Sequence, residues 1–320
     1  MGKMFEGEWI TEEDWSTDDD GAFQRSETTF RDWVRADGST QFPVEDGRYH
    51  LYVSYACPWA HRTLIARVLK GLEDTVSVSV VDPMMGQDGW KFSEAPGTIP
   101  DNVNGADYLR DVYRIADASY TGRVTVPVLW DRKRDTIVNN ESIEIVRMFD
   151  NEFDELAEHA EVDLYPEENR DLIDETIDAI YEPINNGVYK CGFATSQSAY
   201  DRAVEELFDA LDHWDEVLGG RRYLCGDQVT EADICMFTTL FRFDAVYHIH
   251  FKCSTQRLVE YENLWPYARE IYQLPGIAET CNMRHIRQHY YRSHETVNPR
   301  RVIAGEPRMN WEERPRRGSL

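Results

Sequence analysis

The chain of 320 residues carries 34 basic and 59 acidic side chains, a formal net charge of −25 at pH 7. This charge argues against nucleic acid or an anionic membrane surface as a partner, because both would repel the protein. The sequence contains no run of about 18 apolar residues, and its first residues lack the basic-then-apolar layout of a signal peptide. We therefore expect a cytoplasmic protein, long enough for two domains with full hydrophobic cores.

The excess of acid suggests adaptation to salt. Lysine is scarce and occurs at positions 3, 70, 91, 133, 190 and 252, whereas arginine and the acids are abundant. Acidic side chains keep a protein hydrated when salt screens charge repulsion beyond a few ångströms. We therefore expect a halophilic protein, and an ordinary acidic protein is the alternative.

The first part of the chain predicts an arm followed by a βαβ unit. Residues 1–47 are polar and aromatic with no sustained period, which indicates an extended N-terminal arm; its aromatic residues include Trp9, Trp15, Phe23, Phe30 and Trp33. A strand over 48–54, a helix over 58–70 and a strict alternation over 76–81 follow. The two strands of such a unit are usually parallel.

The next segment completes a first domain, expected over 48–150. A long irregular segment begins at Asp82, and loops of this length are usually functional or disordered. A helix, a β-hairpin and a second helix then follow, over 107–116, 126–130 with 136–138, and 141–149. This order of elements is that of a thioredoxin-like domain. Pro127 fits the place where that fold carries a cis-proline beside a reactive cysteine, although the sequence leaves the isomer open.

The second half of the chain predicts an all-α domain. An acidic linker over 151–166 leads into helices over 167–297, and a tail over 298–320 has no helical period. The clearest helix spans 196–218, with its apolar residues mostly on one face. Thr230 and Asp233 form a variant of the capping box at the start of another helix. We expect a bundle of at least five helices.

The most informative motif is Cys57-Pro58-Trp-Ala-His-Arg, between the first strand and the first helix. A cysteine there lies at the helix N-terminus, where unpaired backbone N–H groups and the helix dipole favour the reactive thiolate. Pro58 suits the first helical position, because its missing N–H would have no partner in the helix. We interpret Cys57 as a nucleophile; an inert buried cysteine is the alternative.

The remaining cysteines point to a single-thiol mechanism. The six cysteines, at 57, 191, 225, 235, 253 and 281, show no paired spacing, so we expect buried thiols rather than a disulfide framework. A Cys-x-x-Cys motif would need a second cysteine where Ala60 stands. Cys57 must therefore form a mixed disulfide with a small thiol and be released by a second thiol.

The nearby aromatic and histidine residues have plainer interpretations. Trp59 is expected to pack, and His61 to be a surface or structural histidine although it could share a face with Cys57. His248, His250 and Cys253 resemble a metal site in spacing only, because alternate positions on a helix point apart. We expect no bound metal.

Two further motifs suit a zwitterionic peptide-like thiol. Glu141 and Ser142 at a helix start offer a carboxylate, a hydroxyl and backbone N–H groups, which suit an α-amino acid end, although a simple helix cap is an equal alternative. The stretch from Arg123 to Pro127 adds a cation and backbone groups able to pair with an extended peptide. Together they predict a glutathione-like site next to Cys57.

These motifs resemble the xi class of glutathione transferases, the glutathionyl-hydroquinone reductases. The resemblance spans nearly the whole chain, including the arm and the tail. It rests on separated motifs in the same order: Cys57 to Arg62, Gly89 to Phe92, Arg123 to Trp130, Asn140 to Ser142, Asn186 to Ala194, Arg242 to His248, His250 to Cys253, and Asn298-Pro299.

The resemblance implies a fold, a reaction and a set of site residues. The fold is α/β plus all-α: an N-terminal thioredoxin-like domain and a C-terminal helical bundle. Cys57 is the nucleophile that reduces glutathionyl-hydroquinones, and the other matched positions are thiol contacts at Trp90, Arg123, Val124, Val126, Pro127, Glu141 and Ser142 and a tyrosine trio at Tyr189, Tyr247 and Tyr290. The first tyrosine would donate or accept a proton, and the others would help hold the thiolate. Without the resemblance, these tyrosines would be interpreted as core or surface aromatics.

The resemblance further implies a homodimer with glutathione as co-substrate and no bound cofactor. The thiol could equally be the shorter γ-glutamylcysteine. An omega-like thiol transferase or dehydroascorbate reductase would share Cys57 but not the tyrosine trio. A non-catalytic thioredoxin-like interaction module is the alternative outside enzymology.

Overall fold

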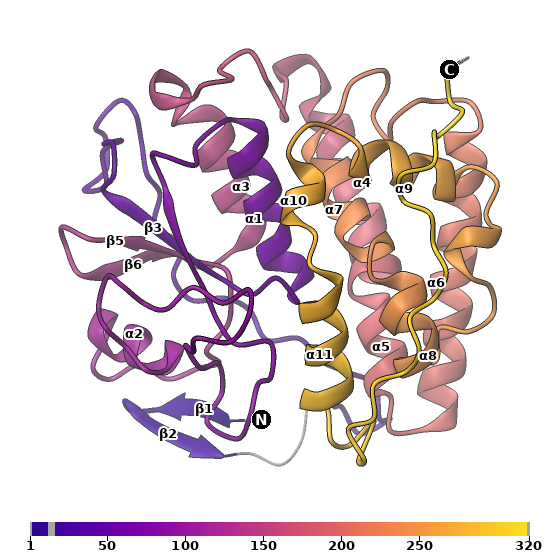
Figure 1. Cartoon of the computed structure of the whole chain (residues 1–320), viewed down its shortest axis with the longest axis horizontal. Coiled ribbons are helices and arrows are strands. Elements are labelled where there is room, and N and C mark those ends of the chain that lie inside the picture. The colour runs from indigo at the N-terminus through magenta and orange to yellow at the C-terminus, as the bar shows by residue number, and fades with distance from the viewer. Residues whose placement is uncertain (1, 12–16, 319–320) are drawn as a thin grey trace. The chain divides into compact units, whose positions relative to one another are not determined.

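The structure, a computed structural model, describes residues 2–11 and 17–318 (Figure 1). Trp15 of the expected arm lies outside the described residues. The chain divides into two compact units, Met1–Asp14 with Ser26–Asp163 and Trp15–Arg25 with Leu164–Leu320. Among the described residues, no helix has the length and apolar character needed to cross a membrane. The expected arm, 1–47, is thus divided between the two units, and its treatment as a separate region stays a prediction.

The first unit is built on a four-stranded mixed sheet in the order β4-β3-β5-β6. The strands are β3 (Tyr49–Val53), β4 (Ser77–Val80), β5 (Val128–Asp131) and β6 (Thr136–Asn139). β3 pairs parallel with β4 and antiparallel with β5, and β5 pairs antiparallel with β6. Helices α1 (Pro58–Leu69) and α3 (Ser142–Asn151) pack together on one face, and α2 (Leu109–Ala116) lies on the other (Figure 1). This arrangement confirms the thioredoxin-like domain and the parallel βαβ unit.

The burial of β3 on both faces explains why its sequence lacks a clear alternation of polar and apolar residues. Every residue of β3 is buried, because the sheet is covered on both faces. His50 is the polar member, and its ring nitrogens lie 2.6 Å from Ser77 Oγ and 3.0 Å from Ser79 Oγ. Ser79 Oγ donates to Pro100 O at 2.8 Å, so it accepts from His50 Nε2–H and leaves Nδ1 as an acceptor. Burial, reinforced by Arg132, lowers the pKa of His50 to about 4.

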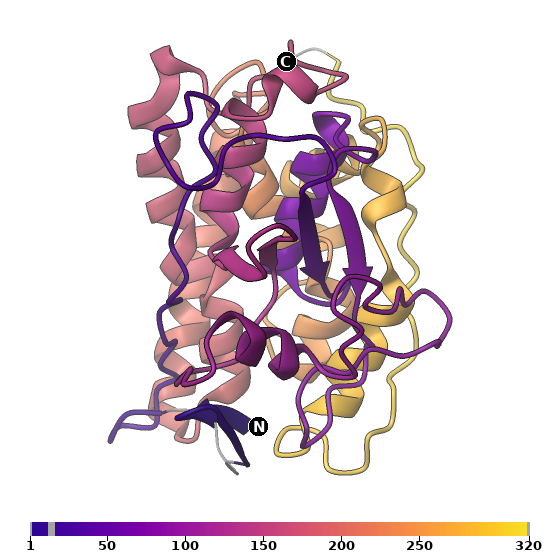
Figure 2. The same ribbon diagram turned by 90° about the vertical axis from the view of Figure 1, so that its left-hand side faces the viewer.

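The arm contains a β-hairpin that the sequence did not predict. Strands β1 (Gly2–Phe5) and β2 (Glu8–Thr11) pair antiparallel around a turn at Glu6 and Gly7, which have φ of 48° and 81°. Two positive φ angles are typical of the two-residue turn that suits strand twist. The turn lacks the Asn-Gly or Asp-Gly pair that is typical of such turns, so the sequence pattern did not predict the hairpin. Figures 1 and 2 both show the hairpin beside α2, where Arg114 Nε donates to Gly7 O at 3.0 Å.

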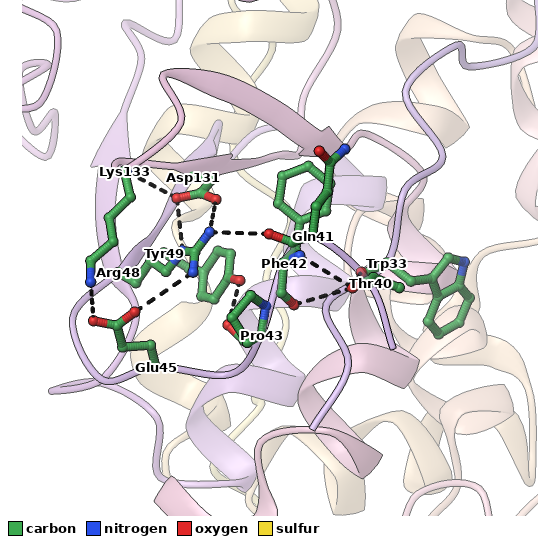
Figure 3. Close-up of polar contacts among 10 residues, drawn as sticks. All are labelled: Trp33, Thr40, Gln41, Phe42, Pro43, Glu45, Arg48, Tyr49, Asp131 and Lys133. Carbon is green, nitrogen blue, oxygen red and sulfur yellow. Dashed lines mark hydrogen bonds and ion pairs between the residues drawn. The ribbon is translucent and has the colours of Figure 1, made fainter. Parts of the chain in front are cut away.

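The second half of the arm is held beside β3 and β5 by hydrogen bonds from Arg48 and Tyr49, and Arg48 is itself fixed by a buried ion pair (Figure 3). Arg48 donates to both carboxylate oxygens of Asp131, at 2.9 and 2.5 Å, and to Gln41 O at 3.4 Å. Tyr49 donates its hydroxyl to Pro43 O at 2.7 Å. The guanidinium fork matches the Asp131 carboxylate and fixes Arg48. Arg48 and Tyr49 then hold the arm through the carbonyls of Gln41 and Pro43.

The segment after α3, expected to be an acidic linker, is held by Lys70 at the end of α1. The Lys70 side chain is buried, and its Nζ donates to Asp154 Oδ1 at 2.7 Å and to Val162 O at 2.6 Å. One turn of 3₁₀ helix, Asp154–Leu156, forms within it. Residues up to Asp163 therefore belong to the first unit, and the exact linker bounds stay a prediction.

The second unit is all-α, as expected. Its helices are α4 (Arg170–Ile180), α5 (Gly187–Phe193), α6 (Gln197–Leu218), α7 (Glu231–Leu240), α8 (His248–His250), α9 (Leu264–Tyr272), α10 (Ile277–Thr280) and α11 (Met283–Ser293). Two π-helical turns, Tyr181–Asn185 and Phe243–Tyr247, lead into α5 and α8. The predicted capping box is present at α7, where Thr230 N donates to Asp233 Oδ2 at 2.8 Å.

The C-terminal tail packs on the helices of the second unit. The Trp311 ring lies 4.7 Å from Trp265 and 4.9 Å from Phe241, centroid to centroid. Arg317 donates to Leu218 O at 3.2 Å and to Arg221 O at 2.7 Å. Leu218 is the last residue of α6 and Arg221 lies just beyond it, so the guanidinium satisfies carbonyl groups that the end of the helix leaves unpaired.

Candidate active site

Cys57 is the N-cap residue of α1, and Pro58 follows in the first turn. The Cys57 backbone is extended, with φ of −76° and ψ of 123°, and its carbonyl accepts the first helical hydrogen bond, from His61 N at 3.0 Å. The side chain is partly exposed, whereas Cys191, Cys225, Cys235 and Cys253 are buried. The sulfur thus lies at the positive end of the helix, as the motif predicted.

The Cys57 sulfur contacts the segment that precedes β5. The Sγ atom lies 3.5 Å from Val126 O, and the Val126–Pro127 peptide bond is cis. Val126 and Pro127 are buried, and Arg123 and Val124 are half-buried. The structure therefore brings together Cys57 and the stretch from Val126 to Pro127, two parts of the predicted site that lie far apart in the sequence.

Glu141 and Ser142 stand at the start of α3, with Glu141 as the N-cap residue. Glu141 N donates to Asn139 Oδ1 at 2.7 Å, which fixes the backbone there. The Glu141 carboxylate accepts from Thr28 Oγ1 at 3.1 Å, and Ser142 Oγ lies 3.5 Å from it. A carboxylate beside a helix N-terminus can pair with an ammonium group while helix N–H groups bind a carboxylate.

Trp90 lies in the long irregular segment, which is ordered by backbone pairing. Its side chain is 7% exposed, and its carbonyl accepts from Leu109 N at 3.0 Å. Asp101 anchors the segment, because its carboxylate accepts from Tyr52 Oη at 2.9 Å and from Val103 N at 3.0 Å. These hydrogen bonds order the loop and so fix the position of Trp90.

In the second unit the three predicted tyrosines meet. Tyr290 Oη lies 2.6 Å from Tyr189 Oη and 3.0 Å from Tyr247 Oη. Tyr189 comes from α5, Tyr247 from the π-helical turn before α8, and Tyr290 from α11. The three phenols form a chain of hydroxyl groups that can pass or share protons.

The environment of the tyrosine chain keeps its inner members protonated. Burial, with the neighbouring phenols, raises the pKa of Tyr290 and of Tyr247 well above the ordinary value of 10. Tyr189 is 9% exposed, against 1% for Tyr290 and 0% for Tyr247. Tyr189 is therefore the most exposed of the three hydrogen-bonded tyrosines, and the two neutral phenols of Tyr290 and Tyr247 lie deeper.

Arg25 lies against the ring of Tyr189, a contact that the sequence did not predict. Its Cζ is 4.8 Å from the Tyr189 ring centroid, and its Nε donates to Asn186 Oδ1 at 2.9 Å. A guanidinium over an aromatic face is attracted to the ring electrons. Arg25 and Thr28 were missed because each contacts a residue more than a hundred positions away, which no local spacing signals.

The structure places the nearby aromatic and histidine residues as follows. His61 is fully buried within α1, so it is not a surface histidine, and its structural role stays a prediction. Arg62 stacks over Trp59, with Cζ 4.3 Å from the ring centroid. His250 Nε2 lies 3.1 Å from His294 Nδ1, and within residues 2–11 and 17–318 no group of three or more His, Cys, Asp or Glu could hold a metal ion.

Comparison with known proteins assigns the chain to one family. The family models "Glutathione S-transferase, N-terminal domain" and "Glutathione S-transferase, C-terminal domain" match residues 56–152 and 197–270. A solved structure described as a Xi class GST from Natrialba magadii is 58% identical with a TM-score of 0.94, covering 100% of this chain and 97% of the other. The chain belongs to the Xi class of glutathione transferases.

Two further comparisons, both with YqjG of Escherichia coli, cover nearly the whole chain. The glutathionyl-hydroquinone reductase YqjG of Escherichia coli is 51% identical over 98% of this chain and 97% of the relative. The glutathione-bound structure of YqjG has a TM-score of 0.90 and 49% identity, with 99% of each chain covered. The resemblance inferred from the motifs is thereby confirmed at the level of the family, while the roles of the individual site residues stay predictions.

Proposed function

We propose that this Xi-class protein is a glutathionyl-hydroquinone reductase that uses Cys57 as its nucleophile. The observation that carries the proposal is the near-full-length similarity to the reductase of E. coli. It is supported by the position of Cys57 at the N-terminus of α1, with Ala60 in place of a second cysteine. A monothiol centre requires an external thiol to complete each turnover.

In the first half-reaction the Cys57 thiolate attacks the sulfur of the glutathionyl-hydroquinone. A sulfur–sulfur bond forms between Cys57 and glutathione, and the bond between sulfur and the aromatic ring breaks. The electron pair of the broken bond stays with the ring, which takes up a proton to become the free hydroquinone. Tyr189 supplies that proton.

In the second half-reaction a free glutathione thiolate attacks the mixed disulfide. Glutathione disulfide leaves, and the Cys57 thiolate is restored. The proton lost by the incoming thiol replaces the one that Tyr189 donated. The net reaction consumes one conjugate and one glutathione, and it produces one hydroquinone and one glutathione disulfide.

The chain of tyrosine hydroxyls suits a proton donor. Tyr290 lies 2.6 Å from Tyr189 and has Tyr247 on its other side, at 3.0 Å. When Tyr189 gives up its proton, the hydroxyl of Tyr290 can donate to the phenolate and Tyr247 can donate to Tyr290. Hydrogen bonds to a charged oxygen are stronger than those between neutral groups, so the chain lowers the free energy of the ionised form.

The thiol is bound by the residues of the first unit. The γ-glutamyl ammonium pairs with Glu141, its carboxylate meets Ser142 and the N-terminus of α3, and Trp90, Arg123, Val124, Val126 and Pro127 supply the remaining contacts. Glutathione is the co-substrate by family membership, and γ-glutamylcysteine offers the same γ-glutamyl group. Family membership also supports a cytoplasmic homodimer, which light scattering after size-exclusion chromatography tests.

The proposal is tested by product analysis with a glutathionyl-hydroquinone and free glutathione. We expect hydroquinone and glutathione disulfide in a one-to-one ratio from the wild-type protein and no turnover from Cys57→Ala. Cys191→Ala is the matched control, because this buried thiol takes no part in the mechanism. Full activity in Cys57→Ala would reject the mechanism. Reduction of dehydroascorbate with no release of hydroquinone would favour the omega-like alternative.

A further inference from the structure

Glu141 receives a hydrogen bond from the N-terminal arm. Thr28 Oγ1 donates to Glu141 Oε2 at 3.1 Å, across 113 positions of sequence. The neighbouring backbone fixes this contact, because Phe30 N donates to Asn140 Oδ1 at 3.1 Å and Asn140 N donates to Phe30 O at 3.0 Å. The arm is therefore paired with the residue that directly precedes Glu141.

This hydrogen bond bears on how Glu141 can recognise an ammonium group. A glutamate side chain has several rotatable bonds, and ordering it when a ligand binds reduces the affinity. Thr28 holds one carboxylate oxygen, Oε2, while Ser142 Oγ stands 3.5 Å from the other, Oε1. Thr28 thus keeps the carboxylate in one orientation before the thiol arrives.

The β1–β2 hairpin of the same arm contacts the segment that leads into Arg123. Met4 N donates to Gly122 O at 2.9 Å, and Gly122 N donates to Met4 O at 2.9 Å. Gly7 N donates to Tyr120 O at 3.1 Å. These backbone pairs fix the residues just before the stretch that lines the Cys57 sulfur.

The hairpin also covers the loop that carries Trp90. Trp9 Nε1 donates to Gln87 O at 3.0 Å, which joins β2 to that loop. Gly89 has φ of 79°, and a Cβ there would lie 3.0 Å from the Trp9 ring. The left-handed backbone and the close approach of the indole both favour a glycine beside Trp90.

We propose that the N-terminal arm completes the thiol-binding site, with Thr28 as a positioning residue for the Glu141 carboxylate and Trp9 as a positioning residue for the Trp90 loop. The ligand class is a γ-glutamyl thiol, so the inference rests on the thiol site of the proposed function. The arm reaches three separate parts of that site: the loop before Trp90, the segment before Arg123, and Glu141 itself.

The first test measures the dissociation constant of glutathione by titration calorimetry on the full-length protein. Thr28→Val keeps the shape of the side chain but removes the donor, and it should raise the dissociation constant by about 3- to 10-fold, the effect of losing one hydrogen bond. Thr28→Ser restores the hydroxyl and should restore the affinity. Thr40→Val is the matched control, because the Thr40 hydroxyl donates within the arm, to Trp33 O at 2.8 Å.

A second readout separates positioning from general damage. The rate at which iodoacetamide alkylates Cys57 depends on the thiolate and not on a γ-glutamyl group, so it should be unchanged in Thr28→Val. Equal losses of affinity in Thr28→Val and Thr40→Val would overturn the role of Thr28. So would an unchanged dissociation constant, or a parallel change in alkylation rate.

The hairpin is tested in the same assay. Trp9→Ala should weaken glutathione binding, whereas Trp33→Ala, which removes an arm tryptophan stacked on Arg35, should not. Equal affinities in the two variants would overturn the role of Trp9. A wild-type protein that binds glutathione but releases no hydroquinone would contradict the proposed function and leave these comparisons intact.

Discussion

The hydroxyl groups of Tyr189 and Tyr290 lie 2.6 Å apart, and Tyr290 is in turn 3.0 Å from Tyr247. Tyr290 is therefore the central member of the chain, and it is almost completely buried. Because burial raises its pKa well above 10, Tyr290 remains a neutral donor near neutral pH. Its hydrogen bond can only strengthen as charge develops on Tyr189.

Removing these hydroxyl groups should affect the chemical step in a graded way. We expect Tyr189→Phe to lower kcat by about 10²-fold or more, the usual contribution of a general acid. Tyr290→Phe removes a supporting hydrogen bond and should lower kcat by about 10-fold. Steady-state kinetics with a saturating glutathionyl-hydroquinone measures both. Equal activity in wild type and Tyr189→Phe would remove this tyrosine from the mechanism.

Alkylation by iodoacetamide at neutral pH should modify Cys57 selectively. Burial raises the pKa of Cys225, of Cys253 and, to about 12, of Cys281, so these thiols stay protonated. Cys57 is partly exposed at a helix N-terminus, where the thiolate is favoured. Mass mapping of peptides after a brief reaction should therefore find the label on Cys57. Label spread over several cysteines of the wild type would contradict the prediction. So would rapid labelling of the folded Cys57→Ser variant.

His50 should make the protein less stable as the pH falls. Its pKa is lowered from 6.5 to about 4 by burial and by Arg132, so the unfolded chain takes up a proton before the folded protein does. The stability that neutral His50 provides is thus complete above pH 6.5 and is lost as the pH falls towards 4. Between pH 7.5 and pH 5 this amounts to about 2 kcal/mol.

Urea unfolding of wild type and His50→Gln at the two pH values measures this loss. The glutamine keeps a polar side chain near Ser79 but does not titrate. We expect the advantage of the wild type to shrink by about 2 kcal/mol at the lower pH. A difference between the two proteins that is the same at both pH values would show that His50 is not responsible.

The net charge of −25 predicts that stability rises with salt. Repulsion among like charges destabilises the folded state at low ionic strength, and salt screens it. The thermal unfolding midpoint should therefore increase steadily as KCl is raised to molar concentrations. Sucrose at matched osmolality controls for exclusion effects that do not depend on charge. A midpoint that is insensitive to KCl would indicate an ordinary acidic protein and not a salt-adapted one.

The part of the site with local signals could be predicted from the sequence. Cys57 and Pro58 mark a strand-to-helix junction by themselves, and the alternation in Ser77–Val80 indicates a strand wherever it packs. Glu141 and Ser142 likewise mark a helix start. In each case neighbouring residues determine the local structure, so the pattern carries the information.

The arm's contacts could not be predicted in this way. The Thr28–Glu141 hydrogen bond spans 113 positions, and its residues form no pattern with each other. The β1–β2 hairpin turns at Glu6-Gly7, a pair without the usual hairpin signal, and its strands are only four residues long. The hairpin is held by tertiary contacts and not by local propensity. Met4 pairs with Gly122, and the Trp9 ring packs against Gly89.

The account depends most on covalent chemistry at Cys57, which a single-turnover experiment tests directly. The protein is mixed with a slight excess of a glutathionyl-hydroquinone in the absence of any free thiol, and intact and peptide masses are recorded with the released hydroquinone. We predict one hydroquinone per chain, one glutathionyl group on Cys57, and release of that group when glutathione is added. Hydroquinone formed without an adduct, or an adduct on another cysteine, would contradict the account.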